Sequence, residues 1–285
     1  MISNGLARAL LVVAGAACIA LLPGEATAQQ VTPIVNPAGT SVGPDHRLPL
    51  RPDSWPWSSI GRVNIAQGRG VHYCTGTLIG PRQVLTAGHC LLDARLSTLV
   101  APQHVHFVAG QSRDGEFHGH SAAVDILTDP DFALAIEGRS QLDLVQPRMM
   151  ARDWAIITLE DALDLRPIAL HVVRHADLPG APEPGEIARA GYSQDRPFLL
   201  SAHRGCSVQT DTPQPGSLLH RCDSMPGDSG SPILLLRDET AGLIGIHTGA
   251  IRGSEGQAGS GRGTGIGVSA SAFASAVALA VEKNR

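Results

Sequence analysis

The sequence predicts an all-β fold, and three features of its composition support that prediction. The chain has 285 residues, of which 43% are hydrophobic and 17% charged, so it can bury the core of one large domain or two small ones. Its 32 glycines and 20 prolines exclude fibrous and coiled-coil structures. Aromatic residues make up only 4%, so the core must consist mainly of Val, Ile, Leu and Ala. Such a core suits many short strands joined by Gly and Pro turns.

Short apolar segments recur between turn signals from Trp55 onward. No amphipathic stretch of helix length separates them, as an alternating α/β sheet would require. The pattern therefore favours a sandwich or barrels. The expected strands lie within residues 58–66, 75–89, 104–110, 122–129, 153–159, 167–173, 231–236, 240–249 and 265–270.

The end of the chain has a different period. Phe273, Val277 and Val281 recur every four residues after Ser269. This spacing places them on one face of a helix. We therefore expect a C-terminal helix over about 270–283 that packs on the body.

The first 28 residues resemble an export signal rather than part of the fold. Arg8 precedes an apolar stretch over 9–22, and Ala26-Thr27-Ala28 forms an A-x-A cleavage site. That stretch is too short to span a bilayer as a mature helix. We expect residues 1–28 to be removed, which predicts a secreted or periplasmic protein with no membrane segment after signal removal.

Export determines how the cysteines are interpreted. Loss of the leader removes Cys18 and leaves an even number of cysteines in an oxidising compartment. Among the three possible pairings, Cys74 with Cys90 and Cys206 with Cys222 are favoured, because each closes a loop of about 15 residues that contributes about 3 kcal/mol. A zinc site is disfavoured because the chain contains no C-x-x-C.

Several classes of function are excluded by what the sequence lacks. A formal net charge of -4 without a basic run disfavours nucleic-acid binding. There is no P-loop motif, and the only lysine is Lys283, which excludes P-loop and Schiff-base chemistry. We expect no metal and no organic cofactor.

Two segments carry residues suited to nucleophilic catalysis. Ser229 lies in GDSGSPI, whose glycines permit a tight turn that exposes the hydroxyl, although a purely structural turn explains this segment equally well. His89 lies in VLTAGHC, after an apolar strand and beside Cys90. A nucleophilic serine needs a base within hydrogen-bond distance, and that base needs a carboxylate to orient it.

Three segments in order resemble a known family. CTGTLIGPRQVLTAGHC, DWAIITL and GDSGSPI are similar to the His, Asp and Ser segments of the chymotrypsin-fold serine endopeptidases. Within that superfamily the chain most resembles the secreted bacterial branch that includes the glutamyl endopeptidases, from about Ser41 to the C-terminal helix. The order His, Asp, Ser also differs from that of the α/β-hydrolases, which argues against an esterase of that fold.

The resemblance implies an architecture. It consists of two packed six-stranded antiparallel β-barrels with the catalytic cleft between them, followed by the C-terminal helix. The protease domain would span 42–285, with barrels over about 55–165 and 166–268. Polypeptides would be the substrates, and the protein would act as a monomer.

The resemblance also assigns catalytic roles. His89 would be the general base and Ser229 the nucleophile, with the backbone N–H groups of Gly227 and Ser229 as the oxyanion hole. Two aspartates compete for the third position. Asp153 opens DWAIITL, and Asp131 opens PDFALAIEG. We expect Asp153 to be the acid and Asp131 to be a turn residue.

Substrate preference is left open by the sequence. Asp223 lies six residues before the nucleophile, where trypsin-type enzymes bind Arg or Lys, which indicates a basic P1 residue. His247 matches the histidine with which glutamyl endopeptidases bind a substrate carboxylate, with Ser224 as a hydroxyl donor, which indicates an acidic P1 residue. A small or apolar P1 residue is the third alternative. The expected pocket residues are His247, Ser224, Asp223, Thr248 and Gly249.

Two further questions, whether the chain is a zymogen and whether it is active at all, each allow two interpretations. The family often pairs the residue equivalent to Asp228 with a newly freed N-terminal ammonium, so residues 29–41 would be a short pro-segment or disordered arm of a zymogen. Otherwise Asp228 only caps a turn. The rival from another class is a catalytically inactive exported binding module on the same fold.

Overall fold

The computed structural model describes residues 1, 45–68, 70–93, 98–136, 149–173, 186–251 and 263–283. The expected pro-segment, and the expected signal peptide apart from Met1, lie outside these residues. The chain divides into two units, Met1–Thr32 and Pro33–Arg285, and every element below belongs to the second.

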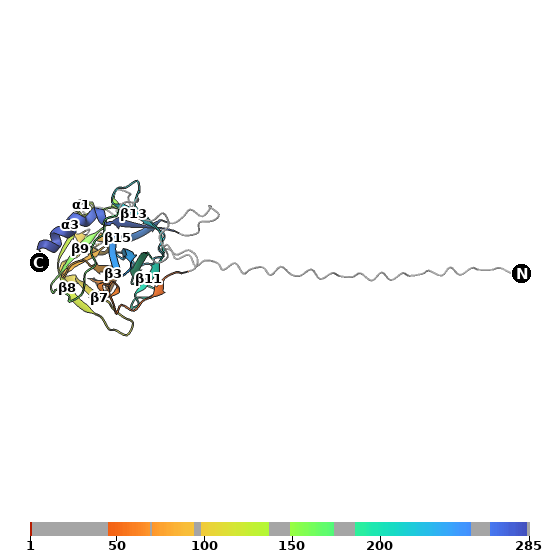
Figure 1. Cartoon of the computed structure of the whole chain (residues 1–285), viewed down its shortest axis with the longest axis horizontal. Coiled ribbons are helices and arrows are strands. Elements are labelled where there is room, and N and C mark those ends of the chain that lie inside the picture. The colour runs from red at the N-terminus through yellow and green to blue at the C-terminus, as the bar shows by residue number, and fades with distance from the viewer. Residues whose placement is uncertain are drawn as a thin grey trace. The chain divides into compact units, whose positions relative to one another are not determined.

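Six antiparallel strands close into a barrel in the first half of the described chain (Figure 1). Strand β2 (Ile60–Gln67) pairs with β3 (Gly70–Leu78) on one side and with β7 (Val105–Ala109) on the other. The order β2-β3-β4-β9-β8-β7 therefore returns to its start. The remaining strands are β4 (Gln83–Thr86), β8 (Gly119–Thr128) and β9 (Ala155–Leu159). The first predicted barrel is confirmed.

Aliphatic side chains fill the barrel, as the low aromatic content predicts. Val63, Leu78, Val84 and Ile157 are fully buried there, and Phe107 is the one large aromatic ring of this cluster. Alternate residues of each strand point inward, so the core is formed by every second side chain.

Seven strands of the second half and β1, which precedes the barrel in the chain, form one sheet of eight strands, in the order β1-β11-β10-β14-β15-β16-β13-β12. This differs from the predicted second six-stranded barrel, because in the described part of the chain the end strands β1 and β12 do not pair with each other. The strands are β1 (Leu48–Pro49), β10 (Ile187–Gly191), β11 (Ser201–Arg204), β12 (Val208–Gln209), β13 (Ser217–His220), β14 (Pro232–Arg237), β15 (Thr240–Ile251) and β16 (Thr264–Ser269).

One strand prediction is wrong. Residues 167–173 form no ladder and make only an isolated parallel bridge between Leu170 and Leu243. The segment starts at Pro167, which has no N–H to donate, and the N–H of His171 donates to the carbonyl of Leu243 at 2.9 Å. The apolar run is thus a connecting segment that contacts β15 at Leu243.

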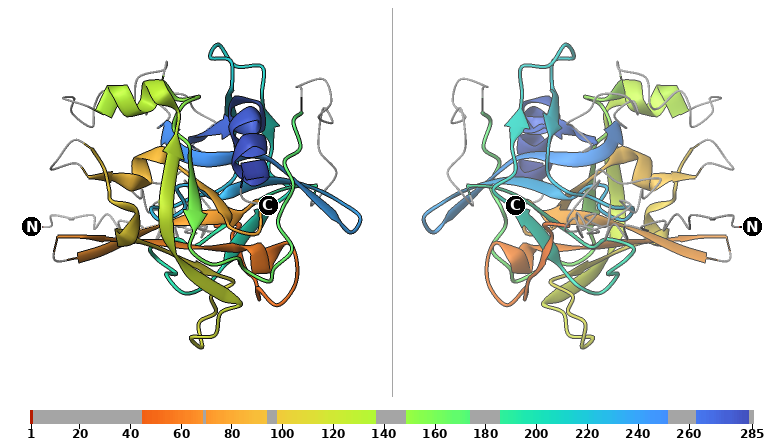
Figure 2. Two further views of the ribbon diagram at one scale, coloured as in Figure 1. Left: turned by 90° about the vertical axis from the view of Figure 1, so that its left-hand side faces the viewer. Right: turned by 90° about the vertical axis from the view of Figure 1, so that its right-hand side faces the viewer.

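The C-terminal helix α3 (Ala270–Lys283) has the predicted bounds. It buries Ala270, Phe273 and Val277, and the Phe273 ring lies 6.3 Å from that of Trp154. Figure 2 shows α3, in dark blue, against the strands of the C-terminal sheet. No described helix is long and apolar enough to cross a membrane.

Shorter elements complete the first half of the chain. Among them are the 3-10 helix η2 (Gly88–Leu91) and the helix α1 (Pro130–Ile136). The others are the 3-10 helices η1 (Trp57–Ser59) and η3 (Pro102–His104) and the two-stranded pair β5 (Leu92–Asp93) and β6 (Thr98–Leu99).

Candidate active site

The imidazole of His89 is oriented by Asp153. Strand β4 ends at Thr86 and leads into η2, which carries His89. Asp153 lies two residues before the start of β9, and β9 is the strand that pairs with β4. Nδ1 of His89 lies 2.7 Å from Oδ2 of Asp153, and the backbone N–H of His89 donates to Oδ1 at 2.8 Å. Two bonds to one carboxylate fix both the loop and the ring, and leave Nε2 as the atom available to accept a proton.

Two opposing effects act on the pKa of His89. Burial lowers it, while the charge of Asp153 and its hydrogen bond raise it. The carboxylate prevails, so the pKa of His89 lies above the usual value for histidine. The ring keeps contact with solvent, since 32% of its side chain is exposed. A histidine in this state is a stronger base than one free in water.

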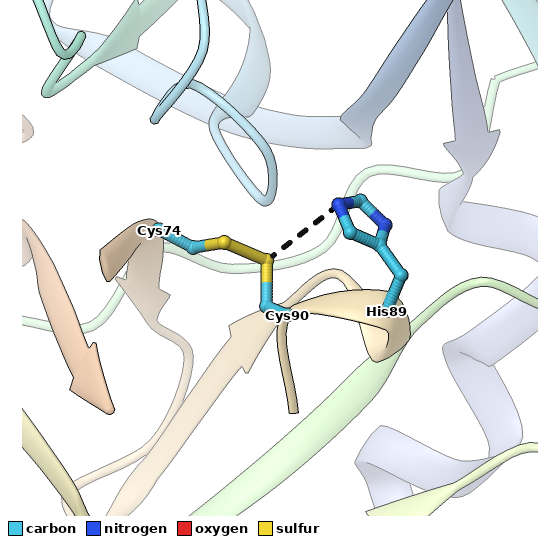
Figure 3. A group of neighbouring side chains, drawn as sticks. All are labelled: Cys74, His89 and Cys90. Atoms are coloured by element: carbon cyan, nitrogen blue, oxygen red, sulfur yellow. Dashed lines mark hydrogen bonds between the residues drawn. A yellow bond between two sulfur atoms is a disulfide. The ribbon is translucent and has the colours of Figure 1, made fainter. Parts of the chain in front are cut away.

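A disulfide supports the loop that carries His89 (Figure 3). Cys74 on β3 is bonded to Cys90 on η2, and Sγ of Cys90 lies 3.9 Å from Nε2 of His89. The second expected disulfide, Cys206–Cys222, is also present. The first bond ties the histidine loop to the barrel wall.

Asp131, the rival for the acid position, lies elsewhere. It occupies the first turn of α1, a helix that the sequence analysis did not predict, and its carboxylate pairs with Arg152 at 2.6 Å. Its side chain is 61% exposed. A carboxylate at a helix N-terminus interacts favourably with the helix dipole, which accounts for Asp131 without catalysis.

The turn that carries Ser229 docks on the barrel. The N–H of Thr75 on β3 donates to the carbonyl of Ser229 at 2.9 Å. Gly230 has a φ of +81°, and a Cβ there would overlap the Thr75 carbonyl and the Thr86 hydroxyl and lie 3.0 Å from the N of Ala87. Only glycine permits this approach. The nucleophile candidate is thereby held beside the strand that leads to His89.

No hydrogen bond joins the Ser229 hydroxyl to His89 in the described part of the chain. The hydroxyl belongs to a half-buried residue. Catalytic hydrogen bonds of this kind are often long before substrate binds. The structure thus brings the Ser229 turn and the His89 loop together without a hydrogen bond between these two side chains.

Two N–H groups beside the hydroxyl make no hydrogen bond to any residue that the structure describes. They belong to Gly227 and Ser229, whereas the neighbouring N–H groups of Asp228 and Gly230 donate to the carbonyls of Met225 and His247 at 3.0 and 2.7 Å. Gly227 has a φ of +92°, which suits glycine alone. These two donors are free to bind a carbonyl oxygen that gains charge.

The carboxylate of Asp228 is fully buried and already has its cation. Arg189 on β10, also fully buried, places Nη1 2.7 Å from Oδ1 of Asp228. Oδ2 accepts from the Ser193 hydroxyl and from the N–H of Met225, each at 2.8 Å. The expected N-terminal ammonium is thus not the partner in this structure, because an internal guanidinium supplies the positive charge. The bond to Met225 does cap the turn.

Two buried histidines contact each other, and one of them is the expected pocket residue His247. Nδ1 of His247, on β15, lies 2.9 Å from Nε2 of His220, on β13. Burial, the nearby charge of Arg189 and the charge of His203 lower the pKa of His220 to about 3. Burial first, and then His220 and Arg189, lower that of His247 well below its usual value. Both rings are therefore neutral at neutral pH.

His220 was missed by the sequence analysis. Its position, two residues before Cys222 in HRC, is the local signal that could have drawn attention to it. Of the other expected pocket residues, Ser224 is buried, while Thr248 and Gly249 on β15 are partly exposed. A Cβ on Gly249 would meet no atom within 4 Å, so space is open beside it.

Asp223 does not present a free carboxylate. Its side chain is 4% exposed, and Oδ2 accepts from both the backbone N–H and Nδ1 of His46, at 2.8 and 2.9 Å. Its own N–H donates to Nδ1 of His203 at 2.8 Å. The group that would bind a basic P1 residue is therefore already bound to other residues.

Among the described residues, two clusters each bring three potential metal ligands within 4.8 Å of one another. In one, both sulfurs are consumed by a disulfide beside His89. In the other, the carboxylate oxygen already accepts the hydrogen bonds of His46. The clusters are Cys74, His89 and Cys90, and His46, His203 and Asp223.

Comparison with known proteins identifies the family. The model of the trypsin-like peptidase domain matches residues 74–246, more than half of the chain and a span that contains all three candidate catalytic residues. The chain belongs to this family. The resemblance to chymotrypsin-fold serine endopeptidases is confirmed.

Curated relatives agree at the level of sequence. "Serine protease 23" of Rattus norvegicus is 29% identical over 168 residues, and that of Bos taurus is 30% identical over 172 residues. Each match covers 56% of this chain, and 42% and 43% of the relative. The chain therefore spans less than half of the length of these relatives.

Solved structures agree at the level of the fold. A Glu endopeptidase in complex with MPD superposes with a TM-score of 0.62 at 19% identity, covering 84% of this chain and 98% of that one. A thermostable serine protease from an extremophilic microorganism gives 0.58 at 18% identity, covering 79% and 97%.

Proposed function

We propose that this trypsin-like peptidase is an exported serine endopeptidase that cleaves peptide bonds after acidic residues. The observation that carries the proposal is the bond from His89 to Asp153 beside the Ser229 turn, together with the two free N–H groups of that turn. A binding module has no physical need for this combination.

The mechanism follows from the direction of these hydrogen bonds. Because Nδ1–H of His89 donates to Asp153, Nε2 takes the proton of Ser229 as its oxygen attacks the scissile carbonyl carbon. The N–H groups of Gly227 and Ser229 bind the resulting oxyanion. Collapse breaks the C–N bond, and Nε2 returns the proton to the leaving amine. Water then hydrolyses the acyl-enzyme by the same steps.

The preference for acidic residues rests on the tautomers of two histidines. The N–H of Cys222 donates to Nδ1 of His220 at 3.2 Å, so in the neutral ring Nε2 carries the hydrogen. That hydrogen is donated to Nδ1 of His247. His247, also neutral, must then carry its own hydrogen on Nε2, where it can donate to a substrate carboxylate. A solved protein of the same fold is a Glu endopeptidase, which agrees with a preference for acidic residues.

The proposal extends to the parts of the chain around the site. The chain is exported by a signal peptide over residues 1–28 and acts on polypeptides as a monomer, with no cofactor. Processing within residues 29–41 would shorten the chain ahead of the described arm. It would not need to supply an N-terminal ammonium to Asp228, because Arg189 already pairs with that carboxylate.

The test uses the secreted chain and quenched peptides that differ only at P1, with Glu, Asp, Arg, Lys, Leu and Ala. We expect cleavage after Glu and Asp, and none with Ser229→Ala. Cleavage after Arg alone would assign the pocket to Asp223 instead. If the folded protein cleaves no peptide and does not react with a serine-directed phosphonylating reagent, the enzyme assignment is wrong and the inactive binding module replaces it.

A further inference from the structure

The arm that precedes the barrel is fixed to the C-terminal sheet. Strand β1 pairs with β11 through Leu48 and Pro49, and the N–H of Leu50 donates to the carbonyl of Leu200 at 2.8 Å. Arg196 donates to the carbonyl of Arg47 at 2.9 Å. This anchoring holds the two residues before β1, His46 and Arg47, against the sheet.

The side chain of Arg47 is only 3% exposed. Its guanidinium bonds to both oxygens of Asp45 and both oxygens of Asp195, at 2.8 to 3.0 Å. Arg196 also contacts both carboxylates, so two arginines and two aspartates balance each other's charge. Nη1 nevertheless donates a further bond to the hydroxyl of Ser193 at 2.8 Å, which connects Arg47 to the interior.

The direction of that connection is fixed by chemistry. The Ser193 hydroxyl has one hydrogen, and an ionised carboxylate such as Asp228 can only accept. Ser193 therefore donates to Oδ2 of Asp228 and accepts from Arg47, which can only donate. Asp228 lies between Gly227 and Ser229, the two residues whose N–H groups are free. Arg47 thus reaches the oxyanion turn through a single hydroxyl.

The neighbouring arm residue reaches the other end of the same segment. His46 donates its backbone N–H and its Nδ1–H to Oδ2 of Asp223. Its ring stacks on that of His203, with centroids 5.1 Å apart. Two consecutive residues of the arm therefore hold the first and last residues of 223–228, a segment that contains Ser224 of the pocket and Gly227 of the oxyanion turn.

We propose that His46 and Arg47 are positioning residues of the active site, with Arg47 fixing the oxyanion turn through Ser193 and His46 fixing the pocket wall through Asp223. This inference rests on the proposed endopeptidase function. The oxyanion donors act on the transition state, so loss of Arg47 falls on kcat. The pocket wall binds the P1 side chain, so loss of His46 falls on KM.

The test compares variants of the full chain with the P1 Glu peptide. Arg47→Ala is expected to lower kcat about tenfold to a hundredfold with little change in KM, because it removes a charge-assisted link to a buried carboxylate. His46→Ala is expected to raise KM several-fold with a smaller effect on kcat. The control is Arg51→Ala, an arginine of the same arm that is 86% exposed and pairs with Asp53, and it should leave both constants unchanged.

Ser193→Ala distinguishes positioning from stability. It leaves the ion pairs of Arg47 with Asp45 and Asp195 in place and removes only the link to Asp228. We expect it to lower kcat as Arg47→Ala does, and the double variant to be no worse than either single one, since both interrupt one path. A thermal unfolding curve of each variant shows that it is folded at the assay temperature.

Wild-type kcat in folded Arg47→Ala, or additive losses in the double variant, would overturn the role of Arg47. If Arg47→Ala does not fold, wild-type kcat in Ser193→Ala has the same consequence. An unchanged KM in His46→Ala would overturn the role of His46. Failure of the wild-type chain to cleave or to react with the phosphonylating reagent is a different outcome, since it removes the proposed function itself.

Discussion

The interiors of the two halves of this peptidase differ in how much charge they bury next to the candidate site. The closed barrel is filled by apolar side chains such as Val63, Leu78 and Ile157. The C-terminal sheet buries charged and titratable groups, among them Arg189 and Asp228, both with no exposed surface. Burying charge is costly unless each group is paired. This difference indicates that the barrel supplies rigid support, while buried charged groups of the sheet hold the turn that carries Ser229.

The largest expected effect separates the two aspartates of the barrel half. Asp153→Asn should lower kcat about ten-thousandfold, because the amide no longer orients His89 or stabilises its charged form. Asp131→Asn should change kcat less than about threefold, because that carboxylate only pairs with Arg152 at the surface. Steady-state assays of both variants measure this. The opposite ranking would assign the acid to Asp131.

The pH dependence of activity in those two variants tests the same distinction independently. The proposed mechanism requires neutral His89, whose pKa is raised, so wild-type activity should fall as pH drops through a value above about 6.5. Removing the charge of Asp153 should move this limb to lower pH in the residual activity, whereas Asp131→Asn should leave it in place.

The next effect breaks the buried charge pair of the sheet. Arg189→Leu leaves Asp228 buried without its cation and should lower the free energy of unfolding by about 3 to 5 kcal/mol. Leu78→Ala, in the barrel core, should cost about 2 to 5 kcal/mol through its cavity. The double variant Arg189→Met with Asp228→Leu should recover most of the stability and none of the activity. Denaturant titration of all three measures this, and recovery of activity would contradict the functional reason for the pair.

A smaller effect concerns the buried histidines. His220 has a pKa of about 3 when folded and about 6.5 when unfolded. Between these values the unfolded chain binds the extra proton, so stability falls with decreasing pH in that window, by about 1.4 kcal/mol per unit at most for this group. His220→Phe should flatten the decline in melting temperature below pH 6.5. An unchanged slope would mean that other groups cause it.

The smallest effect is expected at the surface of the same sheet. Nε of Arg237, at the end of β14, lies 3.2 Å from Oε1 of Glu186, the residue before β10; the two side chains are 54% and 10% exposed. Arg237→Ala should cost less than about 1 kcal/mol, because solvent reaches the guanidinium and screens its charge. Thermal unfolding measures it, and a loss comparable to that of Arg189→Leu would remove the contrast between interior and surface charge.

Features that depend on residues close together in the sequence could be predicted. Glycines around Ser229, the apolar run before His89 and the four-residue spacing of Phe273 and Val277 each reflect the structure within a few positions. His46 and Asp223 are 177 residues apart, and nothing near either one marks their contact. Arg189 in IARAG resembles an ordinary exposed strand position, and only the folded chain shows that it faces a buried carboxylate.

The glycine at position 230 sets the time at which this protein can begin to work. Because the turn must lie against Thr75 and Thr86, Ser229 comes to lie on the same side of the barrel as His89 only after both halves have folded and docked. A chain with one folded half carries His89 and Asp153, or Ser229, but never all three in reach. Under the proposed function, an unfolded copy of this chain therefore has no assembled active site, because the close fit at one glycine makes assembly of the site depend on docking of the two halves.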